Sequence, residues 1–153
     1  MSAPASTRKF DEKREAIIQA ASVLINEVGV QATTLAEVAR AIGLNATSVT
    51  YYFPRKEKLV VAVYDETLTL MEEMAQAALE QPDPAARLRH FIAGQIALRK
   101  RIRAGERGLT TALSEIRTLD TEAYDTLMAH YLRVVDIVRC FFGEWSSNEQ
   151  RAL

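Results

Sequence analysis

The stretch TLAEVARAIGLNATSVTYYFPRKEKL, residues 34–59, decides the fold of this chain. It opens with Thr34 and Glu37, which match the S/T-x-x-E capping box: the threonine hydroxyl accepts from the third helical amide, and the glutamate accepts from the cap amide. Gly43 can adopt a positive φ and end this short helix, and Asn45 is a good N-cap for the next one. The sequence therefore predicts two short helices joined by a tight turn.

These two helices have the spacing of a helix-turn-helix. Ala39 is small where the helices approach closely, and Gly43 supplies the turn four residues later. Val49 is the branched apolar residue that anchors the second helix to the first, with Phe53 also facing inward. The helices then cross steeply, and the outer face of the second can enter a DNA major groove. We predict a DNA reader here.

Outward from this stretch the pattern stays helical. Apolar residues recur every three or four positions from Ile17 to Val28, and Gly29 ends that run. Four more helices are predicted further along, at about 54–80, 85–103, 109–119 and 122–142. Pro54 stands at the start of the first of them. No alternating strand pattern of useful length appears, so the predicted fold class is all-α. The predicted domains are a flexible arm at 1–9, a three-helix helix-turn-helix domain at 10–53 and a helical body at 54–153.

Composition narrows the function. A chain of 153 residues with one cysteine, Cys140, cannot hold an internal disulfide framework or a multi-cysteine zinc site, and it fits a reducing cytoplasm. We expect Cys140 to be a buried small hydrophobe, with redox sensing as the alternative. His90 and His130 stand without a cysteine or carboxylate cluster, so no metal site is predicted. No run approaches the roughly 18 apolar residues of a membrane helix.

The net charge of −1 does not by itself favour a nucleic-acid partner. Its distribution is uneven: residues 1–58 hold eight Lys or Arg against six Asp or Glu, and the remainder holds eleven against fourteen. This asymmetry permits DNA binding by the N-terminal part and does not establish it.

Several runs around the predicted reader share one further pattern. They are REAIIQAA at 14–21, Gly29, ATTLAEVA at 32–39, Gly43-Leu44 and YYFPRKEKL at 51–59. Over about residues 10–60 the chain closely resembles the DNA-binding domain of the tetracycline-repressor (TetR) family. One departure is Thr50, where that family usually has an aromatic residue, most often tyrosine.

The resemblance implies a role for each matching residue. Three would face base edges: Ala46, Thr47 and Thr50. Five would contact phosphates: Thr34, Ser48, Tyr51, Tyr52 and Lys56. The mobile arm would add Arg8, Lys9 and Lys13. In the alternative interpretation, Tyr51 and Tyr52 cover the junction with the following long helix, and Lys56 and Lys58 form a solvated face. Thr34 is a structural cap in either interpretation.

The resemblance also implies a homodimer whose helical body binds a small-molecule effector, without a cofactor, a membrane or an enzymatic reaction. The candidate lining residues are Leu68, Met71, Met74, Phe91, Gln95, Leu98, Leu113, Tyr124, Met128, Tyr131 and Val135. For any one of them, plain core is the alternative. A basic run comprises Arg99, Lys100, Arg101, Arg103 and Arg107. Such a run is typical of a solvated helix end, where cations are favourably placed. The alternative is that these side chains bind a phosphate-bearing ligand such as an acyl-CoA.

The family usually dimerises through two helices that would follow Leu153, so we expect a truncated chain or a disordered end. The alternative is that residues 1–153 dimerise through another surface. In the helix predicted at 122–142, the apolar stripe is Tyr124, Leu127, Met128, Tyr131, Val135, Val138 and Phe142.

The function predicted is a ligand-responsive transcriptional regulator, most simply a repressor. The alternative is a helical ligand- or partner-binding module without sequence-specific DNA recognition. No nucleophile–base pair or phosphate-cradling loop suggests an enzyme.

Overall fold

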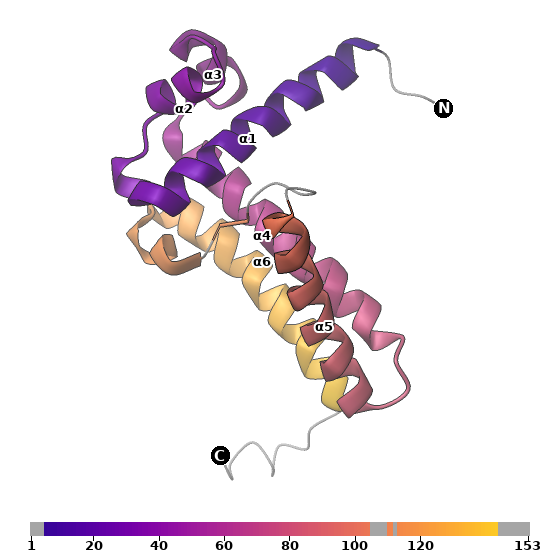
Figure 1. Cartoon of the computed structure of the whole chain (residues 1–153). Helices are drawn as coiled ribbons and strands as arrows, with labels where there is room; N and C mark the ends of the chain where they lie inside the picture. Colours follow the sequence, from indigo (N-terminus) through magenta and orange to yellow (C-terminus); the bar gives the residue numbers. More distant parts are fainter. Residues whose placement is uncertain (1–4, 105–109, 112, 144–153) are drawn as a thin grey trace. The chain divides into compact units, whose positions relative to one another are not determined.

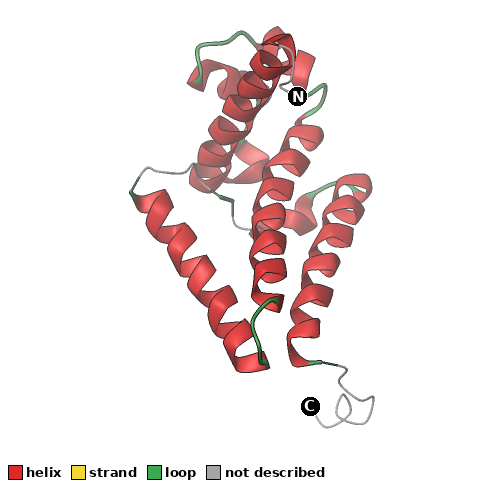
Figure 2. Cartoon of the chain, turned by 90° about the vertical axis from the view of Figure 1, so that its right-hand side faces the viewer, coloured by secondary structure: helices red, strands yellow, loops and turns green. Residues whose placement is uncertain are grey.

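The computed structural model describes residues 5–104, 110, 111 and 113–143. All regular structure among these residues is helical (Figures 1 and 2), which confirms the predicted all-α class. The elements are α1 Ala5–Ala32, α2 Leu35–Ala41, α3 Ala46–Tyr52, α4 Lys56–Leu79, α5 Pro84–Arg103, the 3-10 helix η1 Leu113–Thr118, α6 Thr121–Arg139 and the 3-10 helix η2 Cys140–Phe142. None of the helices described is long and apolar enough to span a bilayer.

The chain divides into two compact units. Unit 1 combines residues 1–67 with 108–127, and unit 2 combines 68–107 with 128–153. Unit 1 therefore holds α1 to α3, η1 and the first parts of α4 and α6. The segment after α5 contributes to unit 1, although the sequence assigned all residues after 53 to the body.

Helix α1 begins at Ala5 rather than near Asp11, so residues 5–9 belong to a helix and not to a flexible arm. An ion pair between Arg8 Nε and Glu12 Oε1, 3.4 Å apart at i and i+4, supports this first part. Gly29 breaks the helix as predicted, with φ +84° and ψ 167°, a conformation that only glycine adopts readily.

The segment before α6 closes unit 1 by contacts to α1 and α4. Glu115 Oε2 accepts from the Val30 amide at 2.9 Å, beside the Gly29 break. The Thr111 hydroxyl donates to Ser22 Oγ at 3.2 Å, and the Thr111 amide donates to Thr67 Oγ1 at 3.1 Å. The broken end of α1 is thus held by residues more than eighty positions away. Of the helix predicted at 109–119, the structure describes the shorter 3-10 helix η1.

Unit 2 has its core where α4, α5 and the end of α6 meet. Phe141 packs edge-on against Phe91, with ring centroids 5.9 Å apart. The core consists of Ala75, Ala78 and Phe141, with Leu79, Phe91, Ile137 and Val138 packed against it. Arg87 completes this end: Nε donates to the Gln81 carbonyl at 3.0 Å, and one terminal nitrogen donates to the carbonyls of Cys140 and Phe141.

The buried stripe near the C-terminus differs from the predicted one. Its buried members are Ala123, Leu127, His130, Val134 and Phe141. Tyr131 and Phe142, predicted to face inward, are exposed. The predicted register failed because His130 occupies the buried face, where its Nε2 lies 2.8 Å from Glu72 Oε2, and counting apolar residues passes over it.

Two smaller expectations were also wrong. Cys140 is exposed rather than buried, because the 3-10 helix that begins there turns Phe141 inward instead. Pro54 lies two residues before α4, which begins at Lys56. Gly143 follows η2 with φ +77°, a backbone conformation that favours glycine.

Candidate nucleic-acid interface

The predicted helix-turn-helix forms from local hydrogen bonds. Thr34 and Glu37 make the complete capping box: Thr34 Oγ1 accepts from the Glu37 amide at 3.2 Å, and Glu37 Oε2 accepts from the Thr34 amide at 3.0 Å. The turn follows at Gly43, with φ +67°, and Asn45 Oδ1 accepts from the Ser48 amide at 2.7 Å. The start of α3 is therefore fixed by its own sequence.

Apolar burial then docks α3 on α2. Val49 is fully buried, as are Val38 and Ala39 on α2, and Phe53 closes the end of α3. Arg14 of α1 lies over the Phe53 ring, with the guanidinium carbon 5.3 Å from the centroid. Because α3 has only two turns, this one anchored face fixes which residues point outward.

The outer face of α3 carries most of the predicted DNA residues. Four of them are exposed: Ala46, Thr47, Thr50 and Tyr51. Ser48 and Tyr52 are half-buried. The Thr50 hydroxyl donates to the Ala46 carbonyl at 2.9 Å. Its proton is therefore used within the helix, which leaves the methyl group and the oxygen lone pairs as the groups that a base could meet.

Two predicted phosphate residues have structural partners. The Thr34 hydroxyl, besides its capping role, donates to Glu37 Oε2 at 2.8 Å. Lys56 Nζ donates to the Gln31 carbonyl at 3.0 Å, which ties the start of α4 to the end of α1. Each side chain therefore already makes a stabilising contact: Thr34 at the start of α2, and Lys56 between α4 and the end of α1.

The two tyrosines contact a residue that the sequence did not single out, Phe10 of α1. The Phe10 centroid lies 4.7 Å from that of Tyr52 and 6.2 Å from that of Tyr51, and the two tyrosine centroids are 5.2 Å apart. A hollow of about 350 Å³ adjoins this cluster. It is lined by Lys13, Leu44, Asn45, Thr47, Ser48, Tyr51 and Tyr52.

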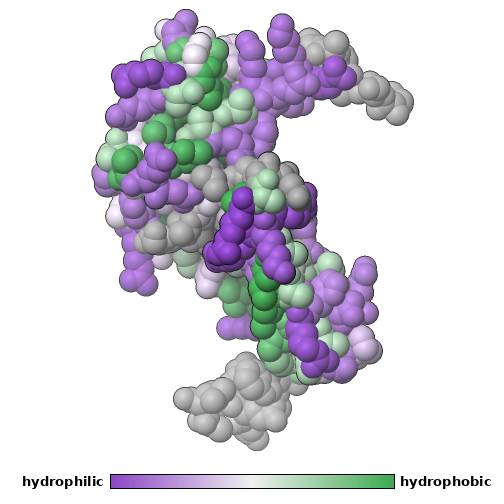
Figure 3. Space-filling model, viewed as in Figure 1, coloured by the Kyte–Doolittle hydropathy of each residue, from purple (hydrophilic) through white to green (hydrophobic). Residues whose placement is uncertain are grey.

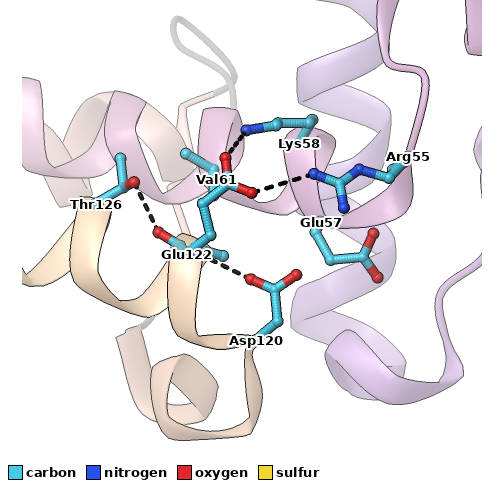
Figure 4. A pocket seen from close by; sticks show the side chains of 8 residues that line it. Arg55, Glu57, Lys58, Val61, Asp120, Glu122 and Thr126 are labelled. Carbon is cyan, nitrogen blue, oxygen red and sulfur yellow. Dashed lines mark hydrogen bonds and ion pairs between the residues drawn. The ribbon is translucent and has the colours of Figure 1, made fainter.

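A second polar cluster joins the start of α4 to the start of α6 (Figure 4). Lys58 Nζ donates to Glu122 Oε1, and Arg55 donates to Glu122 Oε2 at 3.3 Å. The hydrogen bond from Lys58, then its charge and the contact with Arg55, hold the pKa of Glu122 below its ordinary value of 4.5. These two cations therefore share one acidic partner, and the cluster of three side chains keeps a net charge of +1.

This lowered pKa predicts how Glu122 affects stability. A carboxylate with a depressed folded-state pKa stabilises the fold above its unfolded value, and the contribution disappears as the pH falls through the folded value. Glu122→Gln should therefore lower the thermal midpoint at pH 7 and approach wild type as the pH drops below about 4.5. Thermal unfolding between about pH 7 and pH 3 measures this. Glu27→Gln, at an exposed position on α1, is the control. A midpoint difference that stays constant with pH would contradict the prediction.

One buried hydroxyl lies near the contacts that close unit 1. Tyr64 on α4 is fully buried, and its hydroxyl has no hydrogen-bond partner among the described residues. Burial, with a smaller effect of the Glu115 charge, raises the pKa of Tyr64 to about 12. The phenol is therefore neutral in the physiological range.

The predicted effector residues are brought together only in part. Leu68 in unit 2 is buried. Several further residues of unit 2 are half-buried, among them Met71, Phe91, Leu98, Met128 and Val135. Gln95 and Met74 also belong to unit 2. Tyr131 is exposed, Tyr124 falls in unit 1, and the side chain of Leu113 lies outside the described residues. Phe91 belongs to the apolar core, which is the alternative interpretation for this residue.

A hollow of about 210 Å³ in unit 2 contains two of the predicted residues, Met74 and Leu98. Its other lining residues are Leu70, Glu73, Gly94, Ala97 and Arg101. Gly94 lets α5 approach α4, since a Cβ there would lie 3.1 Å from Met74 Sδ. Arg99, Lys100, Arg101 and Arg103 lie on the last turns of α5, and Arg107 lies outside the described residues. In the described part of the chain, no three His, Cys, Asp or Glu side chains gather as metal ligands do.

Comparison with known proteins agrees with this geometry. Residues 17–63 match the model for bacterial regulatory proteins of the tetR family. Over 86 residues the chain is 31% identical to the HTH-type transcriptional regulator RutR of Escherichia coli K12, covering 56% of this chain and 41% of RutR. The chain thus spans about two fifths of the length of this relative.

Solved structures share the fold beyond the reader. The TetR-family regulator PfmR of Thermus thermophilus superposes with a TM-score of 0.68 at 25% identity, covering 82% of this chain and 67% of PfmR. AibR, solved with isovaleryl coenzyme A and operator DNA, gives a TM-score of 0.69 at 24% identity, covering 92% of this chain and 74% of AibR. The helix-turn-helix segment within residues 17–63 therefore carries the sequence pattern of the tetR family, and the chain shares the fold of the TetR-family regulator PfmR.

Proposed function

We propose that this protein is a ligand-responsive transcriptional regulator, most simply a repressor that leaves its operator when a small apolar or amphipathic effector binds the helical body. The observation that carries the proposal is the exposed face of α3. Thr47 and Thr50 stand there with Ala46 on a helix whose opposite face is fixed by Val49. Short polar and methyl-bearing side chains can approach base edges closely.

The family supports the partners in this proposal. RutR is a transcriptional regulator, and AibR was solved with both an acyl-coenzyme A and operator DNA. We propose that this protein likewise binds duplex DNA as a homodimer in the cytoplasm and carries no catalytic reaction. Two reading helices in a dimer must match successive major grooves, about 34–36 Å apart.

We assign the effector to unit 2, where the 210 Å³ hollow offers Leu70, Met74 and Leu98 with Arg101 and Glu73. Such a lining, apolar with one acidic and one basic side chain, suits an amphipathic molecule. The effector must bind the DNA-competent and released states with different affinity, because a ligand that binds both equally shifts nothing. Helix α4 contributes to both units and is our candidate for the element that differs between those states.

Selection from a pool of randomised duplexes tests the proposal. The purified protein should enrich one common sequence with two-fold symmetry. Its affinity should fall steeply between about 50 and 200 mM salt, as expected for a protein that neutralises several phosphates. The second candidate is a binding module without sequence recognition, which the pairing of Arg55 and Lys58 with Glu122 favours, because it reduces the positive charge near the helix-turn-helix. Equal, weak binding to every duplex would support the module and refute the regulator.

Two substitutions separate base reading from phosphate contact. Thr47→Ala should change the ranking of duplexes that differ at one base pair, because a lost base contact is worth about 1–3 kcal/mol of discrimination. Tyr51→Phe should weaken all duplexes alike, by roughly fivefold for one hydrogen bond of about 1 kcal/mol. Competition binding with single-base variants of the enriched duplex measures both. Unchanged relative affinities in Thr47→Ala would show that Thr47 does not read bases.

A further inference from the structure

Helix α1 extends beyond the family's matched segment, which begins at residue 17, and its early turns lie against α3. We propose that Phe10, on this extension, is a positioning residue for DNA binding: its ring holds Tyr51 and Tyr52 in place for phosphate contact. This inference rests on the proposed function.

The first observation is the closed set of three ring contacts. Phe10 lies at 78° to the Tyr51 ring and at 36° to the Tyr52 ring, and the two tyrosine rings are perpendicular to each other. Each ring therefore contacts both others at centroid distances typical of favourable aromatic pairs. Moving either tyrosine ring breaks two of the three contacts.

The second observation is where Phe10 stands. Its neighbours Arg8, Lys9, Asp11 and Glu12 are charged and exposed, and the N-terminal part of α1 is largely hydrophilic at the surface (Figure 3). Phe10 is itself only 39% exposed, because the tyrosines cover much of its ring. The ring contacts that the structure describes for this apolar side chain are thus those with Tyr51 and Tyr52 of α3.

The third observation concerns Tyr51, which is 74% exposed at the end of a two-turn helix. An exposed side chain that must adopt one rotamer to bind loses conformational freedom, which opposes binding. Contact with Phe10 restricts the ring before DNA arrives. Phe10 cannot itself donate a hydrogen bond to phosphate, so its effect on affinity must act through the tyrosines.

Lys13 makes the same region suitable for a phosphate. It lies one turn after Phe10 and lines the 350 Å³ hollow with Tyr51, Tyr52 and Ser48. Arg55 and Lys58 are both ion-paired with Glu122, whereas no ion pair of Lys13 is found in the described part of the chain. The positioned tyrosines therefore stand beside an ammonium group that can attract the DNA backbone.

The test compares the affinity of variants for the duplex that wild type enriches and for a scrambled duplex of equal length. Phe10→Ala should weaken both about three- to tenfold, the equivalent of one to two lost aromatic contacts, with the ranking of duplexes unchanged. Phe10→Leu, which restores apolar volume without a flat ring, should recover part of the loss. Val23→Ala is the matched control, because Val23 is 37% exposed on the same helix and should bind as wild type.

A double-mutant cycle distinguishes positioning from a general effect on α1. If Phe10 acts by holding Tyr51, Phe10→Ala should weaken binding less in the Tyr51→Phe background than in wild type. Equal losses in both backgrounds, or wild-type affinity in Phe10→Ala, would overturn the role of Phe10 while the wild-type protein still enriches its duplex. Failure of wild type to enrich any duplex would refute the proposed function, and the role of Phe10 with it.

Discussion

Changing Val49 to aspartate should unfold the reader and abolish DNA binding. Val49 is fully buried where α3 docks on α2. An ionised carboxylate without a partner there would suffer a desolvation penalty of several kcal/mol, and the apolar burial of the valine would be lost as well. A loss above roughly 3 kcal/mol lowers the thermal midpoint by about 10 °C for a chain of this size. Thermal unfolding and binding to the enriched duplex measure the two effects.

Thr50→Asp is the matched control, because it places the same charge one residue later on the exposed face. It should leave the thermal midpoint within about 2 °C of wild type, as exposed substitutions usually do. It should nevertheless prevent DNA binding, since the new carboxylate would be brought to the base edges inside a groove of the negatively charged duplex. Wild-type stability in Val49→Asp would mean that α3 is not anchored through this residue.

The second large effect is expected in unit 2. Phe141 is fully buried against Phe91, whereas its neighbour Phe142 is 47% exposed. Truncating a buried phenylalanine to alanine typically destabilises by about 3–5 kcal/mol, through lost burial and the cavity left behind. Phe141→Ala should therefore lower the free energy of unfolding by about that amount, as measured by urea denaturation.

Phe142→Ala serves as the comparison and should change stability by less than about 1 kcal/mol. The pair also tests the register of the last helical turns, because the sequence pattern placed Phe142 in the apolar stripe. If Phe142→Ala proves the more damaging change, the inward position of Phe141 is wrong.

The parts of the fold predicted correctly are those that short-range chemistry specifies. Thr34 with Glu37, the turn at Gly43 and the cap at Asn45 each involve residues within four positions of one another. Most of the candidate DNA residues lie on the helix that these signals position, so their exposure followed from the sequence. Val49 and Phe53 were placed inward by the same reasoning, and both are buried.

Several of the parts that failed depend on partners distant in sequence. His130 joins the buried face because Glu72, on another helix, lies within hydrogen-bond distance. The effector residues met a similar difficulty, since which of them line a hollow depends on how α4 and α5 pack at Gly94. Phe10 was missed because its contacts lie about forty residues away on α3. An aromatic residue amid charges near the start of a helix was the signal that could have found it.

The hydrogen bond between Glu115 and the Val30 amide bears on how this helix-turn-helix domain could be transferred to another protein. A reader excised at the end of α3 would leave that amide, beside the Gly29 break, without its carboxylate acceptor. A chimera joining this reader to a foreign body should therefore transplant η1 as well, or choose a recipient that supplies an acidic side chain at the equivalent place. The smallest transferable unit would therefore consist of two segments separated in the sequence, α1 to α3 and η1.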